Sequence, residues 1–63
     1  MNVKDEIYKR GYTILEFCEK IGISRWTLMD ICNGKHKARG TTIYLIAKGL
    51  EMSYEDVKQM LGS

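Results

Sequence analysis

The chain of 63 residues predicts an all-α fold, a compact bundle of about five short helices that forms a single domain over residues 1–63. The sequence contains no proline, and its apolar residues recur at helical spacing instead of the two-residue alternation of a half-buried strand. Hydrophobic residues make up 44% and charged residues 29% of the chain, which is typical of a soluble globular protein. A chain of this length supports one small hydrophobic core.

The first helix is expected from Met1 to about Arg10. Val3 and Ile7 are spaced so that both face the core, and Gly11 is expected to end the helix. The polar residues that follow Met1 do not form an apolar leader, so we expect no signal peptide. No apolar run approaches the ~20 residues needed to cross a bilayer, so we expect no contact with a membrane.

The stretch from Thr13 to Gly34 predicts two short helices joined by a tight turn. Thr13 is expected to cap the first of them, and Glu16 completes a capping box by reaching back to the cap amide. Gly22 ends that helix in the left-handed conformation, and Ser24 caps the second. The expected buried residues are Leu15, Phe17, Cys18 and Ile21 in the first helix and Leu28, Ile31 and Cys32 in the second. This is the helix-turn-helix pattern, whose second helix can enter the major groove of DNA.

Two more helices are expected after a basic loop over residues 35–40. The next helix is predicted from Thr42 to Leu50, with its cap at Gly40 or Thr41. Ser53 is predicted to start a last helix. The expected inward-facing residues are Ile43, Ile46, Ala47 and Leu50 in the fourth helix and Val57, Met60 and Leu61 in the last.

The net charge of +2 is small but unevenly distributed. Asp30 is the single acidic residue between Arg25 and Thr42, a stretch that holds two lysines and two arginines. Glu51 to Ser63 is instead mainly acidic, with Lys58 as its single basic residue. This distribution suits a domain with one end that faces a polyanion and another that faces away from it.

Cys18 and Cys32 both fall on predicted buried faces. We interpret them as small core residues of a reduced cytosolic protein, in preference to a disulfide or a pair of metal ligands. The sequence shows no nucleophile–base pair, paired carboxylates, Gly-rich phosphate loop or metal cluster. We therefore expect no enzyme activity, no cofactor, no metal and no small-molecule ligand.

The chain resembles the lambda-repressor-like family of Cro/cI-type or Xre helix-turn-helix domains. The matching features are Thr13, Cys18 where the family usually has Ala, Gly22-Ile23-Ser24, Arg25, Thr27, Leu28, Ile31, Asn33-Gly34, Ile46 to Leu50 (I-A-K-x-L in the family) and Met52 to Asp56 (V-S-x-E-E). The resemblance covers nearly the whole chain. It implies a sequence-specific, double-stranded-DNA-binding transcriptional regulator, most simply a small repressor in the cytoplasm of a prokaryote or phage host, associated with the nucleoid.

The resemblance also implies which residues meet DNA, with residues 24–33 as the recognition helix. The expected base-reading residues are Arg25, Trp26, Thr27, Met29 and Asp30. The expected phosphate-binding residues are Thr13, Ser24, Asn33, Lys35, His36, Lys37, Arg39, Thr41 and Thr42. Arg25 suits a bidentate pair with guanine, worth about 1–3 kcal/mol of discrimination, and Trp26 suits thymine methyl groups. Two alternatives stay open: Trp26 packs as peripheral core, and Met29 is simply an exposed helix former.

Three departures from the family pattern bear on these expectations. Asp30 carries a charge that phosphates repel, unless it accepts a hydrogen bond from cytosine or pairs with a neighbouring cation. Ile14 stands where the family commonly has a phosphate-binding Gln. Ile7 and Cys32 stand where many members have an Arg–Glu ion pair, and we predict that the two apolar side chains pack together.

Two rival functions follow from these departures. The chain could be a protein-interaction module that has kept the fold and lost DNA binding, as Asp30 and Ile14 suggest. It could also be an antitoxin that binds both a toxin and its own operator. If it acts as a regulator, we expect a weak homodimer on DNA, with an interface on the C-terminal helices. The apolar candidates for that interface are Tyr44, Met52, Tyr54 and Met60.

Overall fold

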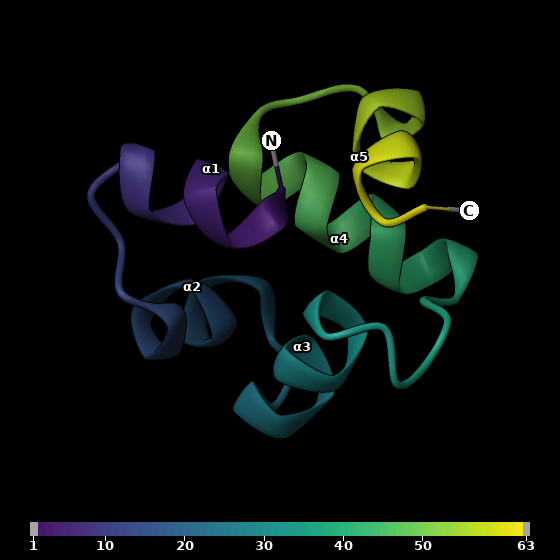
Figure 1. Cartoon of the computed structure of the whole chain (residues 1–63). Coiled ribbons are helices and arrows are strands. Elements are labelled where there is room, and N and C mark those ends of the chain that lie inside the picture. Colours follow the sequence, from purple (N-terminus) through teal and green to yellow (C-terminus); the bar gives the residue numbers. More distant parts are fainter. Residues whose placement is uncertain (1, 63) are drawn as a thin grey trace.

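The computed structural model describes residues 2–62, and within that range the chain forms five α-helices and no strand (Figure 1). The helices are α1 (Val3–Lys9), α2 (Ile14–Ile21), α3 (Arg25–Cys32), α4 (Gly40–Leu50) and α5 (Tyr54–Met60). The predicted all-α fold with a helix-turn-helix is therefore confirmed. Met1, the expected start of the first helix, lies outside the described residues, and Asn2 caps α1 by accepting a hydrogen bond from the Asp5 amide.

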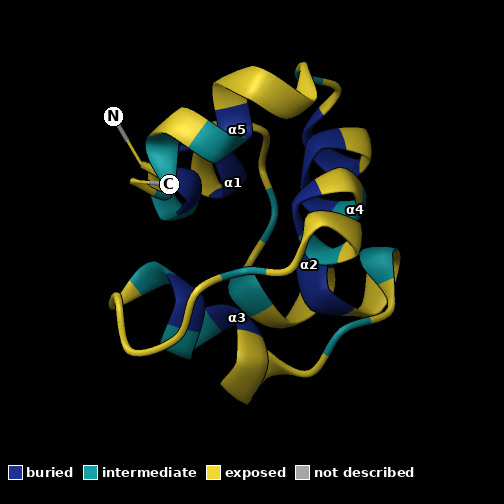
Figure 2. Ribbon diagram, turned by 90° about the vertical axis from the view of Figure 1, so that its right-hand side faces the viewer, coloured by how far each residue is buried: buried dark blue, intermediate teal, exposed yellow. Residues whose placement is uncertain are grey.

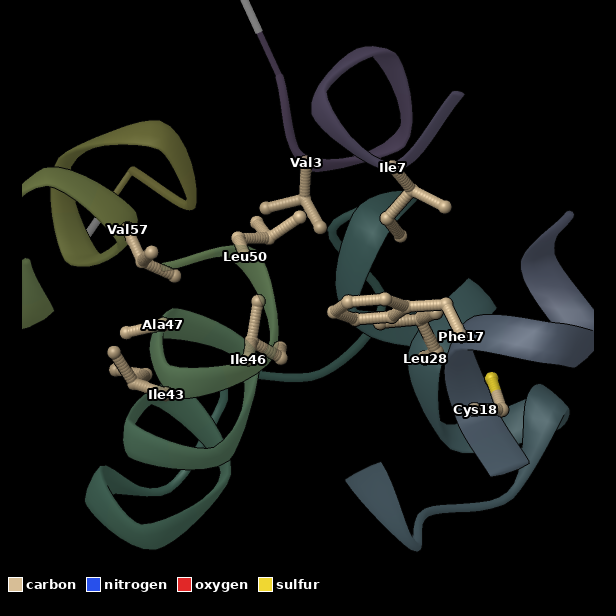
Figure 3. Packing of buried hydrophobic residues seen from close by; sticks show 10 residues of the cluster. All are labelled: Val3, Ile7, Phe17, Cys18, Leu28, Ile43, Ile46, Ala47, Leu50 and Val57. Carbon is tan, nitrogen blue, oxygen red and sulfur yellow. The ribbon is translucent and has the colours of Figure 1, made fainter. Parts of the chain in front are cut away.

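All five helices contribute side chains to one core (Figure 3). Phe17 from α2 and Leu28 from α3 are fully buried and lie beside each other in the view. The other members of the core are Val3, Ile7, Cys18, Ile43, Ile46, Ala47, Leu50 and Val57. Because α4 contacts both α2 and α5, it connects the helix-turn-helix to the C-terminal helix. The inward faces predicted for the first, fourth and last helices are confirmed at Val3, Ile7 and Val57 and along α4.

Side-chain caps start three of the helices as the sequence predicted. The Thr13 hydroxyl accepts from the Glu16 amide at 3.1 Å, and the Glu16 carboxylate accepts from the Thr13 amide at 2.9 Å. These two bonds hold the pKa of Glu16 below its usual range. Ser24 and Ser53 cap α3 and α5 by accepting a bond from the amides of Thr27 and Asp56, without the reciprocal bond seen at Thr13. Gly22 ends α2 with φ of +80°, a conformation that glycine adopts without a steric penalty.

The predicted apolar stripe of α2 was wrong at Leu15, which is 53% exposed. The stripe starts one residue earlier, at Ile14, which packs against the core. Ile14, Phe17, Cys18 and Ile21 follow the i, i+3, i+4, i+7 pattern of one helical face, and Leu15 falls outside it. The side chain that replaces the family's Gln is therefore used for packing.

The predicted start of α4 was also wrong. The helix begins at Gly40 and not at Thr42, and Arg39 is its N-cap, without a side-chain capping bond. The Arg39 carbonyl accepts the first helical hydrogen bond, from Ile43, at 2.9 Å. No hydroxyl side chain is needed for this bond. The helix can therefore begin at Gly40, two residues before the start at Thr42 that was predicted from capping preferences.

The two cysteines are free thiols, with Cys18 buried and Cys32 half-buried. Burial raises the pKa of both thiols. Cys32 packs against the core that contains Ile7. Direct contact between Ile7 and Cys32 stays a prediction.

Candidate nucleic-acid interface

The first turn of α3 is exposed to solvent (Figure 2). The Ser24 hydroxyl accepts from the Thr27 amide at 3.1 Å and donates to the Thr27 hydroxyl at 2.8 Å, so both side chains are held at this turn. Leu28 and Ile31 point into the protein and leave Arg25, Trp26 and Thr27 on the outer side. In Figure 1 this turn lies at the bottom of the molecule, away from α1 and α5.

Trp26 is 71% exposed, so the alternative in which it packs as peripheral core was wrong. The Arg25 guanidinium lies 5.0 Å from the centroid of the indole ring, within cation–π range. Such an interaction at an exposed site contributes about 0.5–1 kcal/mol and favours one arrangement of the two side chains. A large apolar surface and a bidentate hydrogen-bond donor therefore lie next to each other, facing solvent.

A groove separates α3 from the loop that follows it and from the start of α4. Its lining residues are Trp26, Thr27, Asp30, Ile31, His36, Lys37, Arg39 and Thr42. All of these except Ile31 were expected from the sequence to meet DNA. The structure therefore brings residues that the sequence assigned to base reading together with residues it assigned to phosphate binding.

Other expected site residues lie outside this groove. Six of them, all exposed, are not among its lining residues: Thr13, Ser24, Arg25, Asn33, Lys35 and Thr41. Met29 is half-buried and also lies outside the groove, so it is not simply an exposed helix former.

The C-terminal end of α3 determines where the basic loop begins. Gly34 has φ of +76°, and its amide donates to the Ile31 carbonyl at 3.2 Å. The next amide, of Lys35, donates to the Asp30 carbonyl at 2.9 Å. These two bonds form a Schellman motif, which turns the chain back along the last turn of α3. The loop residues consequently lie beside α3 and do not extend away from it.

The Asp30 carboxylate and the His36 imidazole form a pair across this turn. The distance from Nε2 of His36 to Oδ2 of Asp30 is 3.6 Å. A cation beside Asp30 was one of the possibilities that the sequence left open, but its identity was missed. The available signal was Asn33-Gly34, because a Schellman end there brings Lys35 back to the Asp30 carbonyl, and His36 is the next residue.

Residues 6–57 match the model of a family described as helix-turn-helix, of the Cro/cI type. The chain belongs to this lambda-repressor-like family, a family of DNA-binding regulators whose ligand is double-stranded DNA. Comparison with curated proteins found no match, and comparison with solved structures found none. None of the helices described for residues 2–62 is long and apolar enough to cross a membrane. Over the same residues no three His, Cys, Asp or Glu side chains gather as metal ligands would.

Proposed function

We propose that the protein is a sequence-specific transcriptional regulator, acting most simply as a small repressor. In this proposal α3 enters the major groove, where Arg25, Trp26 and Thr27 read base edges. Lys37 and Arg39 bind the DNA phosphates that flank the major groove and determine the register of the protein on the duplex. The observation that carries the proposal is the exposed first turn of α3 next to a basic groove.

The proposal includes a weak homodimer on DNA that occupies two half-sites about 34–36 Å apart. A single small domain binds few phosphates, so two linked copies are needed for tight binding. Tyr44 and Tyr54 support an interface on α4 and α5, because both are exposed aromatic side chains there. Met52 and Met60 are half-buried and line a shallow groove beside them with Asp56 and Gln59.

The test is binding to random-sequence duplex DNA over a series of salt concentrations. We expect the Lys35→Ala/Lys37→Ala variant to flatten the log–log salt dependence, by about 0.9 for each phosphate that the variant no longer binds. The Arg25→Ala variant should lose discrimination between duplexes more than it loses salt dependence, because base contacts carry the sequence information.

The matched control is Lys9→Ala/Lys48→Ala. It changes the net charge equally at two exposed lysines outside the groove, on α1 and α4. This control should keep the slope of the wild type. An equal effect of both double variants would mean that the loop is not the phosphate-binding surface.

A second candidate is a protein-interaction module without DNA binding. Trp26 supports it as well, because exposed tryptophans are enriched among residues that dominate protein interfaces. Absence of DNA binding at low salt and high protein concentration would favour this candidate. An antitoxin would bind both DNA and a toxin, and a toxin gene next to the gene for this chain would favour that function.

A further inference from the structure

Asp30 and His36 lie next to each other in the groove between α3 and the basic loop. The carboxylate is the more covered of the two, with a side chain 38% exposed against 72% for the imidazole. The imidazole is therefore the more accessible of the two to a duplex in the groove, and the carboxylate of Asp30 is the less suited to reach a base edge.

The backbone holds the pair in place. The Lys35 amide is bonded to the Asp30 carbonyl at 2.9 Å, and His36 is the next residue along the chain. Gly34 supplies the left-handed residue that this turn needs. The way α3 ends therefore places the backbone of His36 close to that of Asp30, within reach of a side-chain contact.

The charged groups around His36 can be named element by element. α3 contributes Asp30 to the groove, the loop contributes Lys37 and Arg39, and the start of α4 contributes the uncharged Thr42. Asp30 is thus the one acidic lining residue of an otherwise basic groove. When a duplex is bound, phosphates repel this carboxylate, and a positive charge on His36 offsets the repulsion. Histidine is the side chain that ordinarily gains its charge between about pH 8 and pH 5.

We propose that Asp30 is a positioning residue that holds His36 over the groove, and that the protonated imidazole of His36 binds a DNA phosphate. The inference rests on the proposed DNA-binding function and replaces the base-reading role expected of Asp30. In this proposal DNA binding and the protonation of His36 are coupled. A bound duplex favours the imidazolium, and the protein binds a duplex more tightly when the imidazolium is already formed.

The experiment measures affinity at constant ionic strength from pH 8 to pH 6, for a duplex selected from a random pool by the wild-type chain and for a scrambled duplex. We expect the wild type to bind both duplexes roughly five-fold more tightly at pH 6, which corresponds to one added charge–charge interaction at a surface. Since the chain contains a single histidine, replacing His36 separates its contribution from that of an α-amino group, which ordinarily titrates in the same range.

Three variants separate the roles of the two residues. His36→Gln should bind equally at both pH values, and His36→Arg should bind at pH 8 as tightly as the wild type does at pH 6. Asp30→Asn should bind at least as tightly as the wild type at pH 8, gain less on acidification, and keep the preference for the selected duplex.

Each contrary result has a definite meaning. Equal wild-type affinity at both pH values, or an undiminished gain in His36→Gln, would overturn the phosphate contact by His36. An Asp30→Asn variant that keeps the full gain and loses the preference for the selected duplex would restore Asp30 as a base-reading residue. A wild type that binds neither duplex at either pH would overturn the proposed function itself, and this inference with it.

Discussion

Gly49 occupies the place where α2 and α4 pack without room for a side chain. A Cβ added there would lie 2.5 Å from Cγ2 of Ile21 and 2.9 Å from two ring atoms of Phe17. Phe17 is completely buried, so its ring cannot move into solvent to relieve the contact. The absence of a side chain at Gly49 is therefore a packing requirement of the core.

Gly49→Ala should lower the free energy of unfolding by about 1–2 kcal/mol, because overpacking outweighs the higher helix propensity of alanine. Chemical denaturation measures this change. The matched test is the double variant Ile21→Ala/Gly49→Ala, which removes one of the atoms that the new Cβ would strike. The loss of unfolding free energy in the double variant should be smaller than the sum of the losses in Ile21→Ala and Gly49→Ala. Additive costs would show that Ile21 and the new methyl group do not interfere.

Trp26 offers an internal probe, since it is the single tryptophan of the chain and is 71% exposed. We expect saturating duplex DNA to change its fluorescence emission, because the ring leaves water for the apolar edge of a base pair. Trp26→Ala should weaken DNA binding while changing the free energy of unfolding by no more than about 1 kcal/mol, the upper end of the cation–π contribution that is lost with the ring. Complete DNA binding with unchanged tryptophan emission would place α3 outside the interface.

At the scale of the elements, Arg10 joins the end of α1 to the end of α4. Its Nε donates to the Leu50 carbonyl at 2.8 Å, and its Nη1 donates to the Glu6 carboxylate at 2.7 Å and to the Glu6 carbonyl at 3.0 Å. Glu6 is only 5% exposed, so its negative charge depends on this partner. The hydrogen bond from Arg10 is the main reason that the pKa of Glu6 lies below its usual range.

A carboxylate with a lowered pKa stabilises the folded state above its unfolded pKa, and the contribution is lost as the pH falls through the folded pKa. We therefore expect Glu6→Gln to lower the stability at neutral pH and to reduce the loss of stability on acidification below about pH 4. Denaturation curves at several pH values measure both effects. The exposed Glu55 provides the control for charge, because Glu55→Gln changes the net charge equally without removing a partner of Arg10.

At the scale of the whole molecule, local signals predicted most of the fold. Thr13, Ser24 and Gly22 act within three or four residues of the chain, so their roles follow from sequence alone. The start of α4 at Gly40 was missed because its first hydrogen bond uses a backbone carbonyl, which every residue has. The bond from Arg10 to the Leu50 carbonyl was missed because the two residues are 40 positions apart in the sequence.

In the candidate site, too, the features that depend on local sequence could be predicted, and those that depend on the path of the chain could not. The exposed turn of α3 could be predicted because the buried residues of that helix leave one side free. The pairing of Asp30 with His36 could not be predicted from periodicity, since it depends on how the chain turns after Gly34. Residues that line the groove could therefore be named from the sequence, but which of them act on each other could not.

The bond from Arg10 to the Leu50 carbonyl has a consequence for how the protein is made. During synthesis, α1 cannot reach its final contacts until residue 50 has also emerged from the ribosome, and the core further requires Val57 of α5. Bringing residues together that are far apart in sequence costs chain entropy before their packing stabilises the fold. The helix-turn-helix therefore has no complete core during most of its own translation. This domain should therefore acquire its structure in one late step, after residue 57 has been synthesised.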